Sequence, residues 1–237
     1  MSFLRRKRDT HDDASAGTDA ADETKRTEAS DSADAAGASG DDQIWPGADK
    51  ARPHGPFDIE DVDDAITRID FGALRVPASD GMEVRLDVDD EGRISAVAVA
   101  LEGTVLQLQV FAAPRTLGLW DDVRAEMIAA IAGSGGKAEE DTGPFGPELV
   151  AQVPTDATKP GSGLQPVRFL GVDGPRWFLR GVISGDSGGG PTDLAAAHDV
   201  FRNVVVVRGD AAAPPRELLL LTMPDDPSLR SEPPGQH

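Results

Sequence analysis

Residues 82–112 read MEVRLDVDDEGRISAVAVALEGTVLQLQVFA and contain three segments of strand-like pattern. In Met82–Val88 every second side chain is apolar, which is the period of a strand with one buried face. Asp89–Gly92 has the composition of a turn, and Glu102-Gly103 separates Arg93–Leu101 from Thr104–Ala112. Short connections of this kind join antiparallel neighbours, so we expect a three-strand antiparallel meander.

A two-residue turn at Glu102-Gly103 predicts the pairing of the last two strands. This register collects the larger aliphatic side chains on one face and leaves alanine and glutamine on the other. A slip of one residue would undo the segregation, because successive side chains of a strand point to opposite faces. The expected pairs are Leu101 with Thr104, Val99 with Leu106, Val97 with Leu108, and Ser95 with Val110.

The other elements are predicted from periodicity and from turn residues. We expect helices at 58–66, at 119–132 and from Pro191 to about Asn203, strands at 148–153, 165–172, 176–184 and 204–208, and a docked segment at 218–221. We expect a three-residue loop, Asp173-Gly174-Pro175, in the hairpin 165–184. The predicted fold class is α+β, a single antiparallel sheet built from the meander and the later hairpin, with two main helices packed on it.

Three regions are expected along the chain. Residues 1–57 form an acidic N-terminal region with a short basic start, and they contain too few apolar side chains to offset the entropy of ordering. Ile44-Trp45-Pro46 is the exception and could dock on the domain or on a partner. Residues 58–222 are expected to form a single α+β domain, and the proline-rich residues 223–237 a second disordered tail.

The formal net charge of −19 limits the partners that we expect. After residue 56 the chain still carries 30 acidic and 15 basic residues, a surface that nucleic acid and anionic bilayers would repel. No apolar run approaches the roughly 18 residues of a membrane helix, and no apolar core of a signal peptide follows the basic start. We therefore expect a cytoplasmic protein without nucleic-acid binding or stable membrane association.

The side chains that usually carry catalysis are scarce. The chain has no cysteine and no tyrosine, and of its four histidines only His198 lies within the predicted domain. Thiolate nucleophiles and cysteine metal sites are excluded, and His198 lies near the apolar stripe of its predicted helix, where a packing role is the default. We expect no catalytic residue, no metal site and no cofactor.

Three motifs resemble functional loops and fail in detail. Gly185–Pro191 (GDSGGGP) resembles a serine-protease nucleophile loop, but it has an extra glycine and the histidine follows it. Gly133–Lys137 (GSGGK) follows a helix, whereas a phosphate loop precedes one. Asp87–Gly92 resembles the start of a calcium loop, but Ala98 stands where the bidentate glutamate is needed. We expect a linker, a helix end and a hairpin turn.

Three arginines form the one cluster that suggests a binding site. The three-residue loop would place Arg168 and Arg180 nearly opposite each other, with Arg176 next along the hairpin. Like charges that face each other are unfavourable unless an anion lies between them. Either acidic side chains of the domain, such as Glu83 or Asp87, supply that anion, or Arg168, Arg176 and Arg180 bind an acidic ligand or partner.

Several segments of the chain are distinctive: Arg75–Pro77, Gly81–Val84, Gln107–Gln109, Phe111–Arg115, Gly143–Gly146, Gly171–Gly181 and Val204–Gly209. Together they resemble an uncharacterised actinobacterial family, the domain of unknown function numbered 3710. The resemblance covers roughly Ile66 to Met223 and implies a bacterial, cytoplasmic protein; it implies no activity, ligand or catalytic residue. The order of elements is similar to the PsbP/Mog1-type α+β sandwich, a fold often used for protein binding.

From these observations we expect a non-enzymatic module that binds an unknown protein partner. The alternative is a domain that binds a small anionic ligand through Arg168, Arg176 and Arg180. A hydrolase is the third hypothesis, with His198 as its one candidate base.

Overall fold

The structure is a computed structural model and describes residues 54–79, 81–101, 103–115, 118–156, 163–185 and 191–224, the side chains of 191–193 excepted. Almost all of the two predicted terminal tails, and with them Ile44-Trp45-Pro46, lie outside the described residues. The described part is α+β, with two α-helices and with strands that pair mostly antiparallel.

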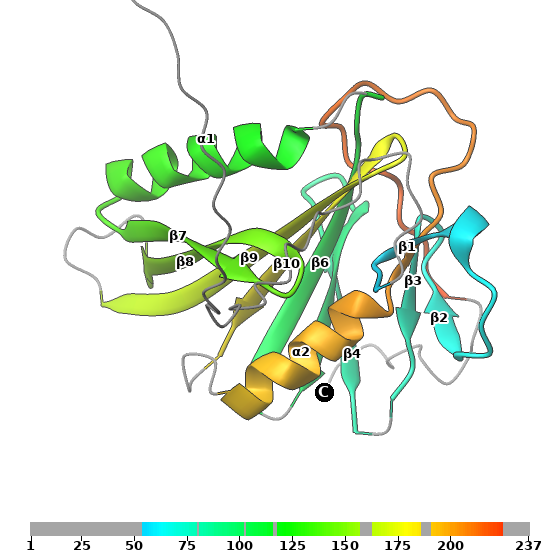
Figure 1. Cartoon of the computed structure of the whole chain (residues 1–237), viewed down its shortest axis with the longest axis horizontal. Helices are drawn as coiled ribbons and strands as arrows, with labels where there is room; N and C mark the ends of the chain where they lie inside the picture. The colour runs from blue at the N-terminus through cyan, green and yellow to red at the C-terminus, as the bar shows by residue number, and fades with distance from the viewer. Residues whose placement is uncertain are drawn as a thin grey trace, which may run out of the picture. The chain divides into compact units, whose positions relative to one another are not determined.

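The larger sheet has seven antiparallel strands (Figure 1). The predicted meander is confirmed, and the register pairs Leu101 with Thr104, Val99 with Leu106 and Val97 with Leu108. Beyond Leu108 the carbonyl of Val110 accepts from the amide of Leu219 instead. In spatial order the strands are β4 (Glu83–Val88), β5 (Ile94–Leu101), β6 (Thr104–Ala112), β10 (Trp177–Ser184), β9 (Leu164–Gly174), β8 (Gly146–Pro154) and β7 (Lys137–Gly143).

The prediction of a single sheet is wrong, because the described residues form a second sheet of four short strands. Its strands join the two ends of the domain, and β1 pairs parallel with β11 across nearly 150 residues of sequence. Strands this short, whose partners are this distant, leave no periodic pattern to detect. In spatial order they are β1 (Phe57–Asp58), β11 (Val205–Val206), β3 (Leu74–Pro77) and β2 (Arg68–Asp70).

The helix predicted at 58–66 is also wrong. The structure has only the 3-10 turn η1 (Ile59–Asp61), which the carboxylate of Asp58 caps by accepting from the amide of Glu60. Val62 is extended, residues 62–67 form no helix, and Ile66 stays 43% exposed. The predicted apolar stripe has no surface to pack on there, so helical spacing alone does not produce a helix.

The hairpin β9–β10 has a two-residue loop, Pro175-Arg176, and the predicted three-residue loop is wrong. Arg176 has a φ of +61°, and with proline before it the turn is of the type II kind. The register pairs Trp177 with Gly174 and Leu179 with Val172, so the side chains of the two strands meet in a different combination from the predicted one. Strand β7 was missed because its sequence, KAEEDTG, is polar and shows no alternation.

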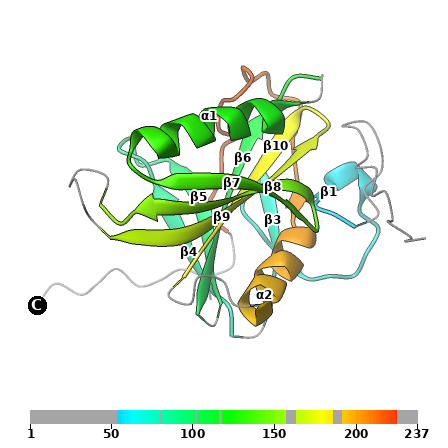
Figure 2. The ribbon, with the colours of Figure 1, turned by 60° about the vertical axis from the view of Figure 1, so that its left-hand side comes forward.

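The two predicted main helices are confirmed as α1 (Leu119–Gly133) and α2 (Pro191–Arg202), and they lie on different sides of the larger sheet (Figures 1 and 2). Two glycines on neighbouring strands allow this approach. A Cβ atom at Gly171 would overlap the indole of Trp120 on α1, and one at Gly181 would lie 2.8 Å from the ring of Phe201 on α2.

The main core fills the side of the larger sheet that carries α2. Its fully buried members include Trp177, Leu106, Leu108 and Phe201, and side chains of the second sheet join them. The predicted docked segment at 218–221 closes this core at the end where β5 leaves β6. It forms isolated bridges to Phe111 and Ile94, and it contributes the buried side chains of Leu219 and Leu221.

Candidate functional site: the groove beside α1

The hairpin register separates the three predicted site residues. Arg168 pairs with Ile183, whereas Arg180 pairs with Gly171. These two pairs lie three positions apart along the strands, and side chains an odd number of positions apart point to opposite faces, so the two arginines lie on opposite faces of the sheet. Arg176 lies in the turn. The structure does not bring Arg168, Arg176 and Arg180 into one site, and the predicted face-to-face placement of Arg168 and Arg180 is wrong.

Arg168 is neutralised within the domain. Its Nη1 lies in an ion pair with Oε1 of Glu148 and 3.4 Å from Oδ2 of Asp141. The side chain of Glu148 is only 3% exposed, and burial raises the pKa of its carboxyl group although Arg168 opposes that effect. The acidic partners expected from the sequence, Glu83 and Asp87, are replaced by two acids of the β7–β8 hairpin.

Arg176 stabilises the turn of the β9–β10 hairpin through its carbonyl group and its side chain. Its carbonyl accepts from the amide of Ala113 and from Nε of Arg208, both within 3.0 Å. Its Nη2 donates to the carbonyl of Gly209 at 3.3 Å. These bonds join the hairpin tip to the residue that follows β6 and to the chain after β11.

Arg180 differs from the other buried arginines. Three other described arginines have side chains that are at most 23% exposed, and each of them forms an ion pair with a carboxylate. They are Arg68, Arg124 and Arg168. Among the described residues, Nη2 of Arg180 donates to the amide oxygen of Gln109, and its buried Nε has no hydrogen-bond partner. The guanidinium carbon lies 5.4 Å from the centre of the Phe111 ring. Burial lowers the pKa of Arg180, because it disfavours the charged form.

Arg180 lies in a groove of about 350 Å³ between α1 and the strands β6 and β10. The sheet contributes Phe111 and Phe178, whose ring centroids are 5.9 Å apart. One stripe of the helix forms the opposite wall, with the spacing of three and four residues that places side chains on one face. The lining side chains from α1 are Leu119, Val123, Glu126, Met127 and Ala130.

The packing of α1 keeps this groove open. Trp120 stacks on Phe178 at 5.7 Å, and its Nε1 donates to the carbonyl of Pro147. These contacts hold the helix over β8 and β9, so the stripe next to it faces the groove. At one end Arg216, from the C-terminal segment, donates to Glu126 at 2.8 Å and bridges the groove.

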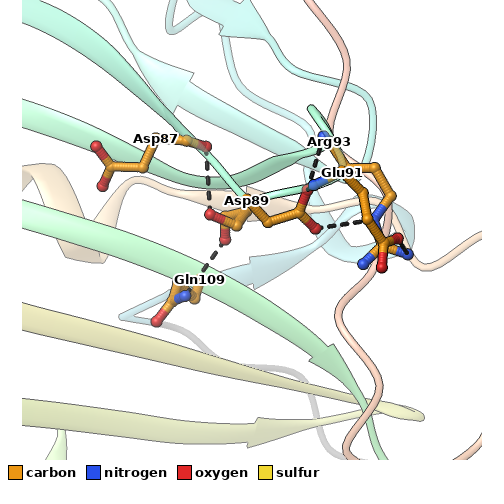
Figure 3. A network of polar contacts seen from close by, with 6 residues as sticks. Asp87, Asp89, Glu91, Arg93 and Gln109 are labelled. Atoms are coloured by element: carbon orange, nitrogen blue, oxygen red, sulfur yellow. Dashed lines mark hydrogen bonds and ion pairs between the residues drawn. The ribbon is translucent and has the colours of Figure 1, made fainter.

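The acidic turn 87–92 supports a hairpin rather than a cation site (Figure 3). Asp89 accepts from the amides of Glu91 and Arg93 and from Nε of Arg93. The amide and side chain of Arg93 lower the pKa of Asp89, so its carboxylate is stabilised by protein donors. Among the described residues no cluster of three or more histidine or acidic side chains is arranged to hold a metal ion.

His198 lies on α2, where its ring makes a T-shaped contact with Phe145 at 5.6 Å. Its buried Nε2 has no hydrogen-bond partner, and burial, followed by Arg168 and Arg202, lowers its pKa. Most of the Gly185–Pro191 motif lies outside the described residues. Gly133–Lys137 ends α1 and starts β7, as a helix end would.

The sequence analysis missed the groove. The helix stripe with Val123 and Met127 was predicted, but its neighbours on the sheet depend on the hairpin register. The available signal was alternation, since β6 and β10 place Gln109, Phe111, Phe178 and Arg180 on one face. Within the described residues, no helix is both long enough and apolar enough to cross a bilayer.

Fold and site together define an α+β protein with two mostly antiparallel sheets and a mainly apolar, arginine-containing groove beside its first helix. The chain belongs to the family described as "Protein of unknown function (DUF3710)", whose profile matches residues 55–229. No curated protein and no solved structure matches the chain.

Proposed function

We propose that the protein is a non-enzymatic interaction module whose groove beside α1 binds an apolar segment of a partner protein. The observation that carries the proposal is an apolar groove that contains Arg180, a half-buried cation with no carboxylate partner among the described residues of a strongly acidic chain. A desolvated charge without a counter-ion destabilises a fold, so its presence is accounted for when a ligand supplies the anion.

The lining defines the chemistry of the partner. Aromatic and aliphatic walls favour a bulky apolar side chain, since buried aromatic anchors dominate the energy of such contacts. Arg180 favours a carboxylate next to that anchor, because its guanidinium lines the groove and has no carboxylate partner among the described residues. The partner segment is therefore an apolar residue flanked by Asp, Glu or a free C-terminus.

We extend the proposal to properties that the sequence suggested. The protein is cytoplasmic and actinobacterial, residues 58–222 form one domain, and the fold is of the PsbP/Mog1-like type. The family resemblance and the order of the elements support these statements. The lack of an acid–base pair around the groove agrees with a binding role, because the acidic side chain in its lining, Glu126, is paired with Arg216.

Peptide selection against the full chain tests the proposal. A random displayed library should yield peptides with a bulky apolar residue beside an acidic one. Met127→Glu should weaken their binding at least about tenfold, because it places a charge in the apolar wall. Leu164→Glu is the control, since Leu164 is 46% exposed on β9 and does not line the groove. Selected peptides that bind Met127→Glu as well as wild type would exclude the groove.

A small anionic ligand is the second candidate, and Arg180, which lines the groove without a carboxylate partner among the described residues, favours it specifically. Because Arg168 and Arg176 are engaged within the domain, such a ligand would depend on Arg180 alone of the three. A thermal-shift screen of carboxylates with apolar tails tests this candidate. A shift of several degrees that Arg180→Gln abolishes would support it, and a shift that survives Arg180→Gln would exclude this arginine.

A further inference from the structure

Gln109 is the hydrogen-bond partner of Arg180 among the described residues. The two residues are register partners on β6 and β10, and Phe111 and Phe178 form the next pair on the same face of the sheet. The amide oxygen of Gln109 accepts from Nη2 of Arg180, and its Nε2 donates to the carbonyl of Ser95 on β5 at 3.3 Å. Gln109 therefore connects the arginine of the groove to the neighbouring strand without carrying a charge.

The types of group on either side determine how the Gln109 amide is oriented. Arginine has donors and no acceptor, whereas a backbone carbonyl has no donor, so the amide turns its oxygen to Arg180 and its nitrogen to Ser95. A glutamate at this position would instead neutralise Arg180, as Glu148 neutralises Arg168 on the opposite face of the sheet. The glutamine satisfies one donor of Arg180 and leaves its charge uncompensated.

We infer that Gln109 determines the charge selectivity of the groove beside α1, which takes a segment with a single carboxylate next to its apolar anchor. This selectivity rests on the proposed docking function and adds the residue that controls it. A neutral neighbour keeps the cation available to a ligand, whereas a charged neighbour would pair with it and remove the preference for acids.

The charges around the groove favour one negative charge on the ligand over two. The lining contains two arginines, Arg180 and Arg216, and one carboxylate, Glu126. Arg216 lies 2.8 Å from Glu126 and 3.6 Å from Asp122, so of the two lining arginines it is Arg180 that lacks an acidic partner. A carboxylate matches that single cation. A phosphate monoester carries about 1.5 to 2 negative charges at neutral pH and would keep an unmatched charge in the same groove as Glu126.

The partial burial of Arg180 strengthens the discrimination. Its side chain is half-buried, and its guanidinium carbon lies 5.4 Å from the centre of the Phe111 ring. A hydrogen bond between two charged groups is stronger in such surroundings than in water, and an amide in place of the carboxylate forms only the weaker kind. We therefore expect an acidic ligand to bind at least about tenfold more tightly than its amide.

A double-mutant cycle between ligand and protein tests the role of Gln109. Each peptide selected against the groove is prepared with its acid and with the corresponding amide, and both forms are titrated into the full wild-type chain and into Gln109→Glu. Wild type should bind the acid at least about tenfold more tightly, and in Gln109→Glu this ratio should fall to about twofold or less, because the new carboxylate neutralises Arg180. A general loss of structure would weaken both forms and leave the ratio. A ratio that is unchanged in Gln109→Glu would overturn the inference while the docking function stands.

Two further variants separate the charge at position 109 from other effects. Gln109→Met removes the hydrogen bonds but adds no charge, so the acid should keep an advantage of roughly fivefold or more although both forms bind more weakly. Gln152→Glu is the matched control, because Gln152 is exposed on β8 and does not line the groove. It should keep the wild-type ratio. Loss of the ratio in either variant would overturn the inference, and near-ultraviolet circular dichroism checks that each variant is folded.

A set of small probes separates this inference from the proposed function. If no peptide is selected, the docking function fails, and the same cycle is then measured with phenylacetate and phenylacetamide by ligand-observed NMR on the full chain. The phenyl ring matches the wall formed by Phe111 and Phe178, and the two probes differ in charge. A preference for phenylacetate that Gln109→Glu abolishes would support the selectivity without the peptide partner, and equal binding of both probes to wild type would overturn it. Phenyl phosphate should bind more weakly than phenylacetate, and tighter binding would overturn the selection of a single charge.

Discussion

At the scale of single residues, two arginines of one hairpin have opposite surroundings. Arg168 faces the buried carboxylate of Glu148, so that each charge compensates the desolvation of the other. Arg180 has an amide oxygen and an aromatic ring as neighbours and keeps one donor without a partner. Arg168 therefore stabilises the fold, whereas the buried charge of Arg180 lowers its stability. Residues that lower stability in this way are typical of binding sites.

The two arginines should respond differently to replacement by methionine. Arg168→Met should lower the free energy of unfolding by about 3 kcal/mol at neutral pH, because Glu148 would remain buried without a partner. Arg180→Met should change it by less than about 1 kcal/mol or raise it, because an uncompensated cation is removed while the aliphatic stem is kept. Urea denaturation of both variants measures the difference. Equal losses would contradict the assignment of Arg180 as an unpaired charge.

His198 should make stability depend on pH in a predictable direction. Burial and the nearby Arg168 and Arg202 lower its pKa below 6.5, although Asp199 opposes them. The unfolded chain then binds a proton more readily, so this contribution to stability is complete above pH 6.5 and is lost as the pH falls through the folded pKa. His198→Met should reduce the loss between pH 7.5 and 5.5. The effect should stay well below about 1.4 kcal/mol per pH unit, since solvent screens a half-buried group.

At the scale of elements, helices and strands were predicted correctly where one face of the element is apolar and the other is polar. The meander 82–112 and the two helices follow from alternation and from helical spacing, which are properties of consecutive residues. The β9–β10 loop was misread because both faces of that hairpin are largely apolar, so segregation of side chains does not select a register. Pro175 was compatible with a two-residue turn, but Arg176 stands at the position of positive φ where such turns usually have glycine or asparagine, so the sequence did not mark it.

The docking of α1 should depend on the absence of a side chain at Gly171. A Cβ atom there would overlap the Trp120 indole, so Gly171→Ala should lower the free energy of unfolding by about 2 kcal/mol and alter the near-ultraviolet circular dichroism of tryptophan. Gly163→Ala is the matched control, because its Cβ atom would meet only Oγ1 of Thr155 at 3.8 Å. If both variants were equally stable, the close approach of Trp120 would not be needed for helix packing.

At the scale of the whole molecule, the predictions failed where residues far apart in the sequence pair with each other. The second sheet joins residues near 57 and near 205, and no local pattern marks strands of two residues. The candidate site failed for the same reason, because the place of Arg180 depends on the pairing of β10 with β6 across some 70 residues. The residue type was recognised, but its neighbours could not be derived from the sequence.

The C-terminal segment should be a structural requirement, because it replaces β5 beside the end of β6. The amide of Leu219 donates to the carbonyl of Val110 at 2.9 Å, and the side chains of Leu219 and Leu221 are each 7% exposed. Replacing both leucines by alanine should lower the free energy of unfolding by about 5 kcal/mol, a large part of the total for one domain. Leu220→Ala is the internal control, since Leu220 is 73% exposed and should contribute less than about 0.5 kcal/mol. Urea denaturation of the three proteins measures these values.

Because the same segment holds Arg216 against Glu126, the double variant should also release the bridge at the end of the groove, and peptide binding should weaken together with stability.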